Sequence, residues 1–227
     1  MRAQGNNRWL ALVLVVAVFF FVFTAAIGLP IYIRPFYYAH IDALDLPGVS
    51  GFTADQIKDA YDEVLDYLTL PGREFGTGVM ACSERAADHF RDCKVLFDLN
   101  AVVLMASALV IVALELLRRS GRIGTLTLGG HGGAFWGALS ALGIPVVVGT
   151  LAALDFDRAF VIFHGIFFPG KDNWLFDWYA DQIIRVLPQQ FFMNCAILIG
   201  IGIAVLSLGI MALSRNNGKE NSHGHQA

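Results

Sequence analysis

Four long apolar segments constrain the fold of this chain more than any other feature of its sequence. They cover residues 9–29, 99–117, 132–154 and 191–213. A helix of about 20 apolar residues crosses a hydrocarbon core roughly 30 Å thick, and each segment is long enough to do so. Apolar residues make up 56% of the chain and charged residues 15%, a balance more apolar than that of most water-soluble domains. The sequence therefore predicts an all-α, polytopic membrane protein with four transmembrane helices.

The distribution of charge predicts the orientation of these helices. Seven of the 16 basic residues, but only two of the 19 acidic residues, lie at the two termini and around the connection between the second and third segments. Basic residues near span ends favour the cytoplasmic side of a membrane. Both termini are therefore expected in the cytoplasm, and residues 30–98 and 155–190 are expected to form acidic segments on the outer side.

The spans and their connections are expected to form one integral membrane domain, residues 1–214, followed by a disordered cytoplasmic tail, residues 215–227. Gly133 and Gly137 lie four residues apart in the third span, a pattern of small residues that lets helices approach closely. Packing against another span of the same bundle is the favoured use of this pattern. Nothing supports a homodimer, so a monomer is expected.

The outer segments are expected to form a helical cap. Residues Thr53 to Gln56 match a capping box, the signature of a helix start, and Pro71 with Gly72 ends the helix. Between them, apolar residues recur at helical spacing: Ile57, Ala60, Tyr61, Val64, Leu65 and Leu68. Ser83 is the expected N-cap of a second helix that continues without a break into the second span. Asp177 is expected to cap a short helix that ends at Pro188.

Two histidines in the outer segments are the candidate catalytic residues. His89 lies among charged residues shortly before the second span, and His164 lies in an aromatic stretch. Imidazole titrates near neutral pH, so two such rings at a lipid surface indicate acid–base chemistry on a lipid. Asp92 follows His89 by three residues and would share its helical face. A hydrogen bond between His89 and Asp92 is therefore expected.

Other polar and aromatic residues on the same side are candidate contacts for a lipid. Basic side chains could contact its charged or carbonyl groups, and aromatic rings could shape an acyl pocket or anchor the protein at the membrane interface. The candidates are Lys94, Phe167, Phe168, Trp174, Asp181 and Arg185.

Two other kinds of function remain open on these residues. A zinc-dependent, lipid-facing hydrolase could draw its ligands from His89, His164 and Asp92, together with Asp88 or Asp181, but no H-E-x-x-H or similar spacing is present. A non-catalytic lipid-binding or assembly protein would use the same outer surface without changing a lipid. A transporter is disfavoured because the spans carry few ionisable residues, all near helix ends.

Two stretches of the chain resemble the lipoprotein intramolecular transacylases, a family of small bacterial membrane proteins with four spans. The first stretch contains Ser83, Glu84, His89, Asp92 and Lys94 and leads into the second span. The second contains Phe163, His164, Phe167, Phe168, Asp172, Asn173, Trp174, Asp177, Asp181, Leu187, Pro188, Phe191 and Phe192. Cys93, Gly165 and Trp178 are atypical of the family, but none of them is a proposed catalytic group.

The resemblance implies an acyltransferase that acts on lipoproteins. Members of this family move the sn-2 acyl chain of a diacylglyceryl-cysteine lipoprotein to the α-amine of that cysteine, which gives the lyso-form lipoprotein. The implied partners are the diacylated lipoprotein N-terminus and membrane lipid, without nucleic acid, metal or organic cofactor. The implied location is the bacterial cytoplasmic membrane, with the active site at the outer leaflet.

Elementary chemistry fits this activity. The pKa of an α-amine is about 8, so a single imidazole can serve as its general base. The amine and the ester belong to one molecule, and holding them in attack geometry can be worth about 7–11 kcal/mol, so no acyl-enzyme is required. We assign the base to His164. His89, held by Asp92, is assigned to polarise the ester carbonyl or to protonate the departing sn-2 oxygen.

Overall fold

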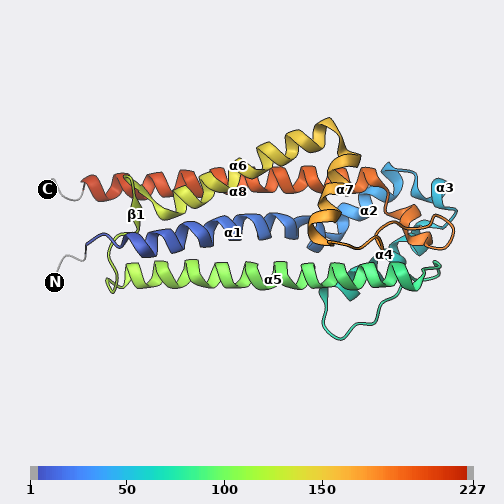
Figure 1. Cartoon of the computed structure of the whole chain (residues 1–227). Helices are drawn as coiled ribbons and strands as arrows, with labels where there is room; N and C mark the ends of the chain where they lie inside the picture. Colours follow the sequence, from blue (N-terminus) through green and yellow to red (C-terminus); the bar gives the residue numbers. More distant parts are fainter. Residues whose placement is uncertain (1–4, 224–227) are drawn as a thin grey trace. The chain divides into compact units, whose positions relative to one another are not determined.

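The computed structural model describes residues 5–223, without the side chains of residues 144, 146–148, 150–153 and 215–223. The described chain is largely helical, with one pair of two-residue antiparallel strands (Figure 1). Its elements are α1 (Arg8–Tyr32), α2 (Arg34–Ala43), α3 (Leu46–Ser50), α4 (Ala54–Thr69), α5 (Glu84–Arg119), β1 (Thr127–Leu128), β2 (His131–Gly132), α6 (Gly133–Leu154), α7 (Phe156–Phe167), the 3-10 helix η1 (Gln182–Val186) and α8 (Gln189–His223).

Three helices among the described residues are long and apolar enough to cross a membrane. They are α1, α5 and the part of α8 from Gln189 to Ser214, and each contains one of the predicted spans. The remaining predicted span, residues 132–154, coincides with α6. Some side chains of α6 are not among those that the structure describes. The structure therefore shows a multi-pass, all-α membrane protein.

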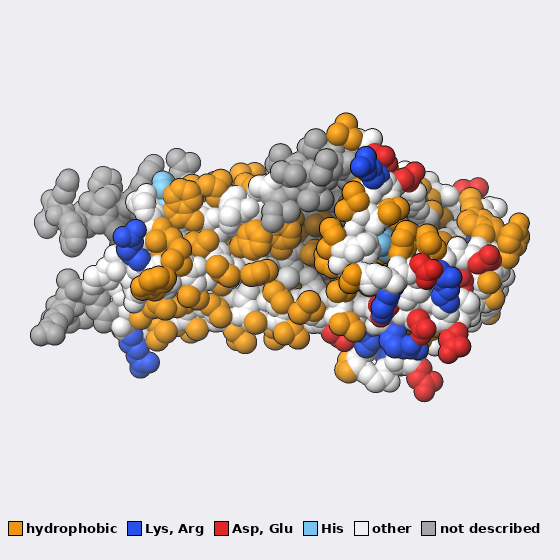
Figure 2. All heavy atoms as spheres, in the orientation of Figure 1, with side chains coloured by type: hydrophobic (Ala, Val, Ile, Leu, Met, Phe, Trp, Pro, Cys, Tyr) orange, Lys and Arg blue, Asp and Glu red, His pale blue; other side chains and the backbone are white. Residues whose placement is uncertain are grey.

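The chain divides into two compact units, which we describe separately. The first unit comprises Met1–Ile27, Ala101–Thr150 and Ile199–Ala227, and the second comprises Gly28–Asn100 and Leu151–Leu198. Hydrophobic side chains cover the visible face of the first unit (Figure 2). Many of them are exposed, among them Leu12, Val16, Phe20, Val102, Met105, Leu109 and Leu116. Exposed apolar side chains along such helices are what contact with lipid requires.

The core of the first unit joins α1, α6 and α8. Val18, Ala138 and Ile203, one from each helix, are buried in a common cluster. A Cβ atom on Gly137 would lie 2.6 Å from the carbonyl oxygen of Val15 in α1, so only glycine permits this approach. The small-residue pattern of the sequence is therefore used for packing within the bundle, as predicted.

The second unit confirms the helix predicted after Thr53. The backbone N–H of Gln56 donates to Thr53 Oγ1 at 3.2 Å, and the N–H of Thr53 donates to Gln56 Oε1 at 2.9 Å, which completes the capping box. The buried residues of α4 are those expected from the sequence: Ile57, Ala60, Tyr61, Val64, Leu65 and Leu68. Tyr61 stacks on Tyr37 of α2 with ring centroids 3.7 Å apart, which fixes α4 against α2.

The helix that carries His89 also forms as expected. Ser83 Oγ accepts a hydrogen bond from the backbone N–H of Ala86, and α5 then runs unbroken to Arg119. A rise of about 1.5 Å per residue makes this helix longer than the hydrocarbon core is thick. Its apolar part begins near residue 99, so His89 and Asp92 precede the membrane-spanning segment.

Several elements differ from those predicted from the sequence. The helix α7, which carries His164, was not expected; it begins after Asp155, whose Oδ1 accepts from the N–H of Arg158. The short helix predicted from Asp177 is wrong at its start, because Asp177 caps a turn and the 3-10 helix η1 begins only at Gln182. At the other end of the chain, α8 continues to His223, beyond the predicted span end; residues 224–227 of the predicted tail lie outside the described residues.

Candidate active site

His89 of α5 and His164 of α7 face each other in the second unit. Their ring centroids lie 5.7 Å apart, with 34° between the ring planes. Both side chains are buried: His89 is 8% exposed and His164 is 5% exposed. The convergence of the two imidazoles that the sequence predicts is therefore confirmed, while their chemical roles stay predictions.

The backbone of α7 fixes the protonation pattern of His164. Nδ1 of His164 lies 2.8 Å from the carbonyl oxygen of Phe160. A carbonyl oxygen only accepts hydrogen bonds, so Nδ1 carries the hydrogen and Nε2 carries the lone pair. Burial lowers the pKa of His164, and the bond to the Phe160 carbonyl opposes that shift only in part. At neutral pH the ring is therefore a neutral base with its lone pair on Nε2.

His89 is also a neutral imidazole at neutral pH. Burial, followed by the proximity of His164, lowers the pKa of His89 from 6.5 to about 4, against the opposing effects of Asp92 and Asn173. Its Nε2 lies 3.4 Å from the sulfur of Cys93, one helical turn further along α5. Burial raises the pKa of the Cys93 thiol to about 12, so the sulfur stays protonated and is a poor nucleophile.

Aromatic rings enclose the two imidazoles. Trp174 stacks on His164 at 4.4 Å between ring centroids. Phe168 packs edge-on against His89 at 4.9 Å, and Phe176 does the same at 5.6 Å. Phe167 behaves differently, because its side chain is 48% exposed and contacts Phe163. The site is therefore a small apolar enclosure around two bases, and Phe167 lies at its outside.

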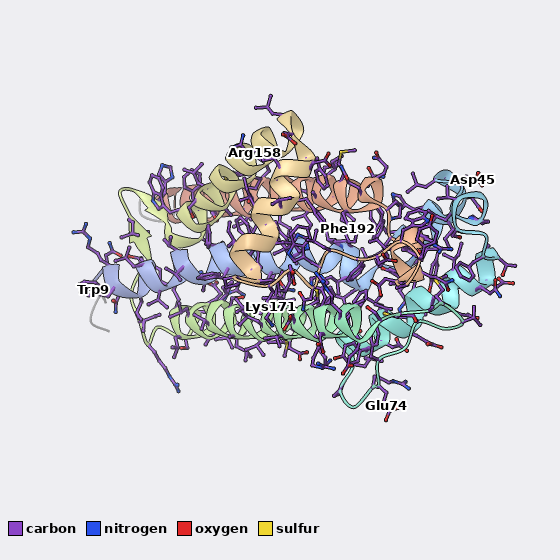
Figure 3. All side chains as sticks on the ribbon, turned by 45° about the vertical axis from the view of Figure 1, so that its right-hand side comes forward. Trp9, Asp45, Glu74, Arg158, Lys171 and Phe192 are labelled. Carbon is purple, nitrogen blue, oxygen red and sulfur yellow. The ribbon has the colours of Figure 1, made fainter. Side chains whose placement is uncertain are left out.

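The expected hydrogen bond between Asp92 and His89 is not among the contacts of the described residues. The carboxylate of Asp92 instead accepts from Lys171 Nζ at Oδ1 and from Asn173 Nδ2 at Oδ2, the latter at 3.0 Å. Burial alone would raise the pKa of Asp92, but these two donors outweigh it and lower the pKa. Asp92 is thus an ionised group behind His89, held by a segment distant in sequence; Figure 3 labels Lys171 on that segment, between α7 and η1.

Asp181 is buried, but its carboxylate is occupied by backbone groups. Oδ1 accepts from the N–H of Ser83 at 2.8 Å, and Oδ2 accepts from the N–H of Asp177 at 2.9 Å. These bonds fasten the segment before η1 to the start of α5. The geometry shows an architectural part for Asp181, and its predicted contact with substrate stays a prediction.

Lys94 and Arg185 contact backbone carbonyls away from the two imidazoles. Lys94 Nζ donates to the carbonyl oxygens of Tyr67 and Leu70 at the end of α4, at 2.7 and 3.4 Å. Arg185 Nε donates to the carbonyl oxygen of Trp178 at 2.9 Å. Their predicted contact with substrate stays a prediction, and neither has a described contact with His89 or His164.

Lys171, Asn173 and Phe176 were not among the site residues selected from the sequence, although Asn173 lies in a stretch that resembles the family. All three lie in the segment 169–181, which the start of α5 holds through several contacts: Arg85 pairs with Asp172, Asp92 with Lys171 and Asn173, and Ser83 with Asp181. Lys171 and Asn173 are two residues apart outside any helix, a spacing that lets both side chains point the same way. That spacing was the available signal.

The described residues contain no group of three or more His, Cys, Asp or Glu side chains placed to hold a metal ion. A zinc hydrolase at this position would need a third ligand beside His89 and His164.

Comparison with known proteins identifies the family. The model of the lipoprotein intramolecular transacylase Lit matches residues 12–192. The solved structure of the membrane-integral Lit from Bacillus cereus is similar at 26% sequence identity and a TM-score of 0.85, over 95% of this chain and 97% of that chain. Two versions of that protein with one histidine replaced, by arginine or by alanine, are each 25% identical, with TM-scores of 0.80, over 95% of this chain and 93% or 94% of theirs. No significant match to a curated protein was found. The chain belongs to the lipoprotein intramolecular transacylase family.

Proposed function

We propose that this protein transfers the sn-2 acyl chain of a diacylglyceryl-cysteine lipoprotein to the α-amine of the same cysteine, which yields the lyso-form lipoprotein. The observation that carries the proposal is the pair of buried imidazoles of His89 and His164, 5.7 Å apart, in a chain of the transacylase family. The hydrolase alternative is not favoured by the family assignment.

The proposal includes a place in the membrane. We assign four spans, namely α1, α5, α6 and α8. Both termini are assigned to the cytoplasm, and the site to the outer leaflet of the bacterial cytoplasmic membrane. The charge distribution supports this orientation, since acidic residues outnumber basic residues in the segments around the site, whereas basic residues outnumber acidic residues at the termini and around the connection between α5 and α6. The diacylated lipoprotein N-terminus enters from the surrounding lipid. All assigned groups come from one chain, so a monomer suffices.

Two neutral imidazoles match the proton balance of the reaction. An α-amine is mostly protonated at neutral pH, because its pKa is about 8. It must lose two protons overall: one before it attacks the ester and one after the nitrogen–carbon bond forms. One of these protons goes to the glyceryl oxygen when the carbon–oxygen bond breaks, and the other leaves to water. Each imidazole can carry one of them.

The surroundings of the two rings distinguish their roles. His89 has the carboxylate of Asp92 behind it, which favours its protonated form against the effect of burial. His89, neutral before the reaction, is therefore the ring suited to take the second proton of the amine and pass it to the departing sn-2 oxygen. His164 has only the Phe160 carbonyl at Nδ1 and presents a lone pair at Nε2. We therefore assign His164 as the base toward the amine. The scheme uses side chains alone and invokes no metal or organic cofactor.

The aromatic enclosure supports transfer over hydrolysis. Phe168, Phe176 and Trp174 surround the imidazoles and limit access of water. A reaction between two groups of one bound molecule needs no water, and holding them together can supply about 7–11 kcal/mol of the barrier. Exclusion of water then protects the ester from the competing attack. Phe168 and Trp174 are the aromatic residues to which we assign the acyl contact.

The test is conversion of a defined diacylated lipopeptide by the purified protein in proteoliposomes, read by tandem mass spectrometry. Intramolecular transfer moves one acyl chain to the α-amine and leaves the total mass unchanged. The matched control is the double variant His89→Gln, His164→Gln, which should leave the lipopeptide as supplied. Release of free fatty acid would show a hydrolase, and identical products from the wild type and the double variant would show a protein without this activity.

A further inference from the structure

We propose that Asn173 is a positioning residue for His89: its side-chain amide fixes which nitrogen of the imidazole carries the hydrogen and couples the ring to the carboxylate of Asp92. This inference rests on the proposed function, since it concerns the same reaction. It assigns to Asn173 the part that the sequence analysis gave to a direct bond from Asp92.

The contact with Asp92 fixes the orientation of the Asn173 amide. An ionised carboxylate only accepts hydrogen bonds. Because Oδ2 of Asp92 lies 3.0 Å from the Asn173 side chain, the atom facing it must be the donor Nδ2. The carbonyl oxygen Oδ1 of Asn173 is then turned away from Asp92, and it is available to accept a hydrogen bond from elsewhere.

Asn173 and His89 each carry a buried polar atom. Among the described residues, Oδ1 of Asn173 and Nδ1 of His89 are both buried without a hydrogen-bond partner. A buried polar atom left unpaired costs about 1–3 kcal/mol. Asn173 is also among the groups that favour the protonated form of His89 and raise its pKa. A small rotation of either side chain that joins Nδ1–H to Oδ1 satisfies both atoms at once.

Lys171 holds the other carboxylate oxygen of Asp92. Its ammonium group pairs with Oδ1 of Asp92, which keeps that carboxylate ionised and leaves Oδ2 to Asn173. The direction of the whole chain of hydrogen bonds is thereby set: Lys171 and Asn173 donate to Asp92, and His89 donates to Asn173. With its hydrogen on Nδ1, His89 has its lone pair on Nε2, which lies 3.4 Å from the thiol of Cys93.

The charged and titratable groups that face His89 raise or lower its pKa. From α5 these are Asp92 and Cys93, from α7 His164, and from the segment 169–181 Lys171. His164 and Lys171 oppose a positive charge on His89, while Asp92 and the Asn173 amide favour it. Asp92 thus acts on the ring directly by its negative charge, and the Asn173 amide is the group that links the two side chains.

The test compares Asn173→Leu and Asn173→Asp by the NMR titration of His89 in the purified protein and by the pH dependence of lyso-form production. The leucine variant removes the acceptor, so the His89 titration and the acidic limb of the rate should move to lower pH, and kcat should fall on the order of 10- to 100-fold with KM unchanged. The aspartate variant places a carboxylate against the ring, so both should move to higher pH.

The matched control is Asn194→Leu, which removes an amide that contacts a different histidine, His40, at 2.9 Å. It should leave the His89 titration and the rate unchanged. If the two Asn173 variants shift the His89 titration in opposite directions, the inference is supported. Substitution of a merely structural residue would lower stability or rate without shifting this titration. If the His89 titration is unchanged in both Asn173 variants, the inference is wrong. A wild-type protein that titrates as expected but makes no lyso form would defeat the proposed function alone.

Discussion

Trp174 lies nearly parallel to His164, with ring centroids 4.4 Å apart and 27° between the planes. This stack and the Phe160 carbonyl together hold the imidazole in one orientation. We predict that Trp174→Phe keeps most of the activity, because an aromatic face remains, whereas Trp174→Leu reduces kcat about tenfold through a loosely held base. Initial rates of lyso-form production by the two variants measure this. Equal rates for both would mean that the stack has no part in catalysis.

His164→Ala should abolish production of the lyso-form lipoprotein while leaving insertion into the membrane intact. The substitution removes the base, and general acid–base catalysis is worth roughly 10²- to 10⁴-fold. Mass spectrometry of a lipoprotein co-expressed with the variant provides the measurement. His131→Ala is the matched control, because His131 is an exposed histidine of β2 in the first unit. Normal levels of lyso form in the His164 variant would show that the base is misassigned.

Asp92→Asn should slow the reaction less severely than loss of either histidine. The amide can still accept hydrogen bonds from Lys171 or Asn173, but the negative charge that favours protonated His89 is gone. We expect a decrease in kcat on the order of tenfold, with KM unchanged. Asp98→Asn, at an exposed position of the same helix, is the control. A variant as inactive as His89→Gln would contradict this ranking.

Acid should destabilise the protein through His89. Burial lowers the pKa of His89 in the folded protein to about 4, while the unfolded chain titrates near the ordinary value of 6.5. Below pH 6.5 the unfolded state therefore binds more protons, and stability falls as the pH drops from 6.5 toward 4. His89→Gln removes this contribution, so its melting temperature should decline less than that of the wild type over this range. Parallel declines would show that His89 titrates normally in the fold.

Asp181→Ala should reduce stability rather than affinity for substrate. The substitution leaves the backbone N–H groups of Ser83 and Asp177 without their acceptor, and a buried unpaired donor costs about 1–3 kcal/mol. We expect a lower melting temperature with KM close to that of the wild type. An increase in KM at unchanged stability would instead restore Asp181 as a contact for substrate.

Local signals in the sequence predict the local structure well. The capping box at Thr53 and Gln56 predicts the start of α4, and the apolar spacing predicts its buried face, because both depend on neighbours within a few residues. The helix α7 was missed although Phe156, Phe160, Phe163 and Phe167 recur at helical spacing, because its aromatic residues were interpreted as contacts for lipid. Asp155, which caps the helix from just outside it, is a second signal.

For the candidate active site too, the sequence predicts only what local patterns encode. The motifs predict the two histidines, since each sits in a recognisable stretch, and the structure brings them together. The partner of Asp92 could not be predicted from helical spacing, because Asp92 takes its hydrogen bonds from Lys171 and Asn173, about 80 residues further along the chain. Pairing over such a separation depends on how the segment 169–181 folds back, which no local pattern encodes.

The segment 169–181 contributes to both imidazoles at once. Lys171 and Asn173 hold the carboxylate behind His89, and Trp174 of the same segment lies against His164. Lifting this stretch away from α5 would therefore disable acid and base in a single motion. A conformation in which this segment had moved away to admit a lipid tail would be inactive. Turnover could begin only after the segment had returned to α5.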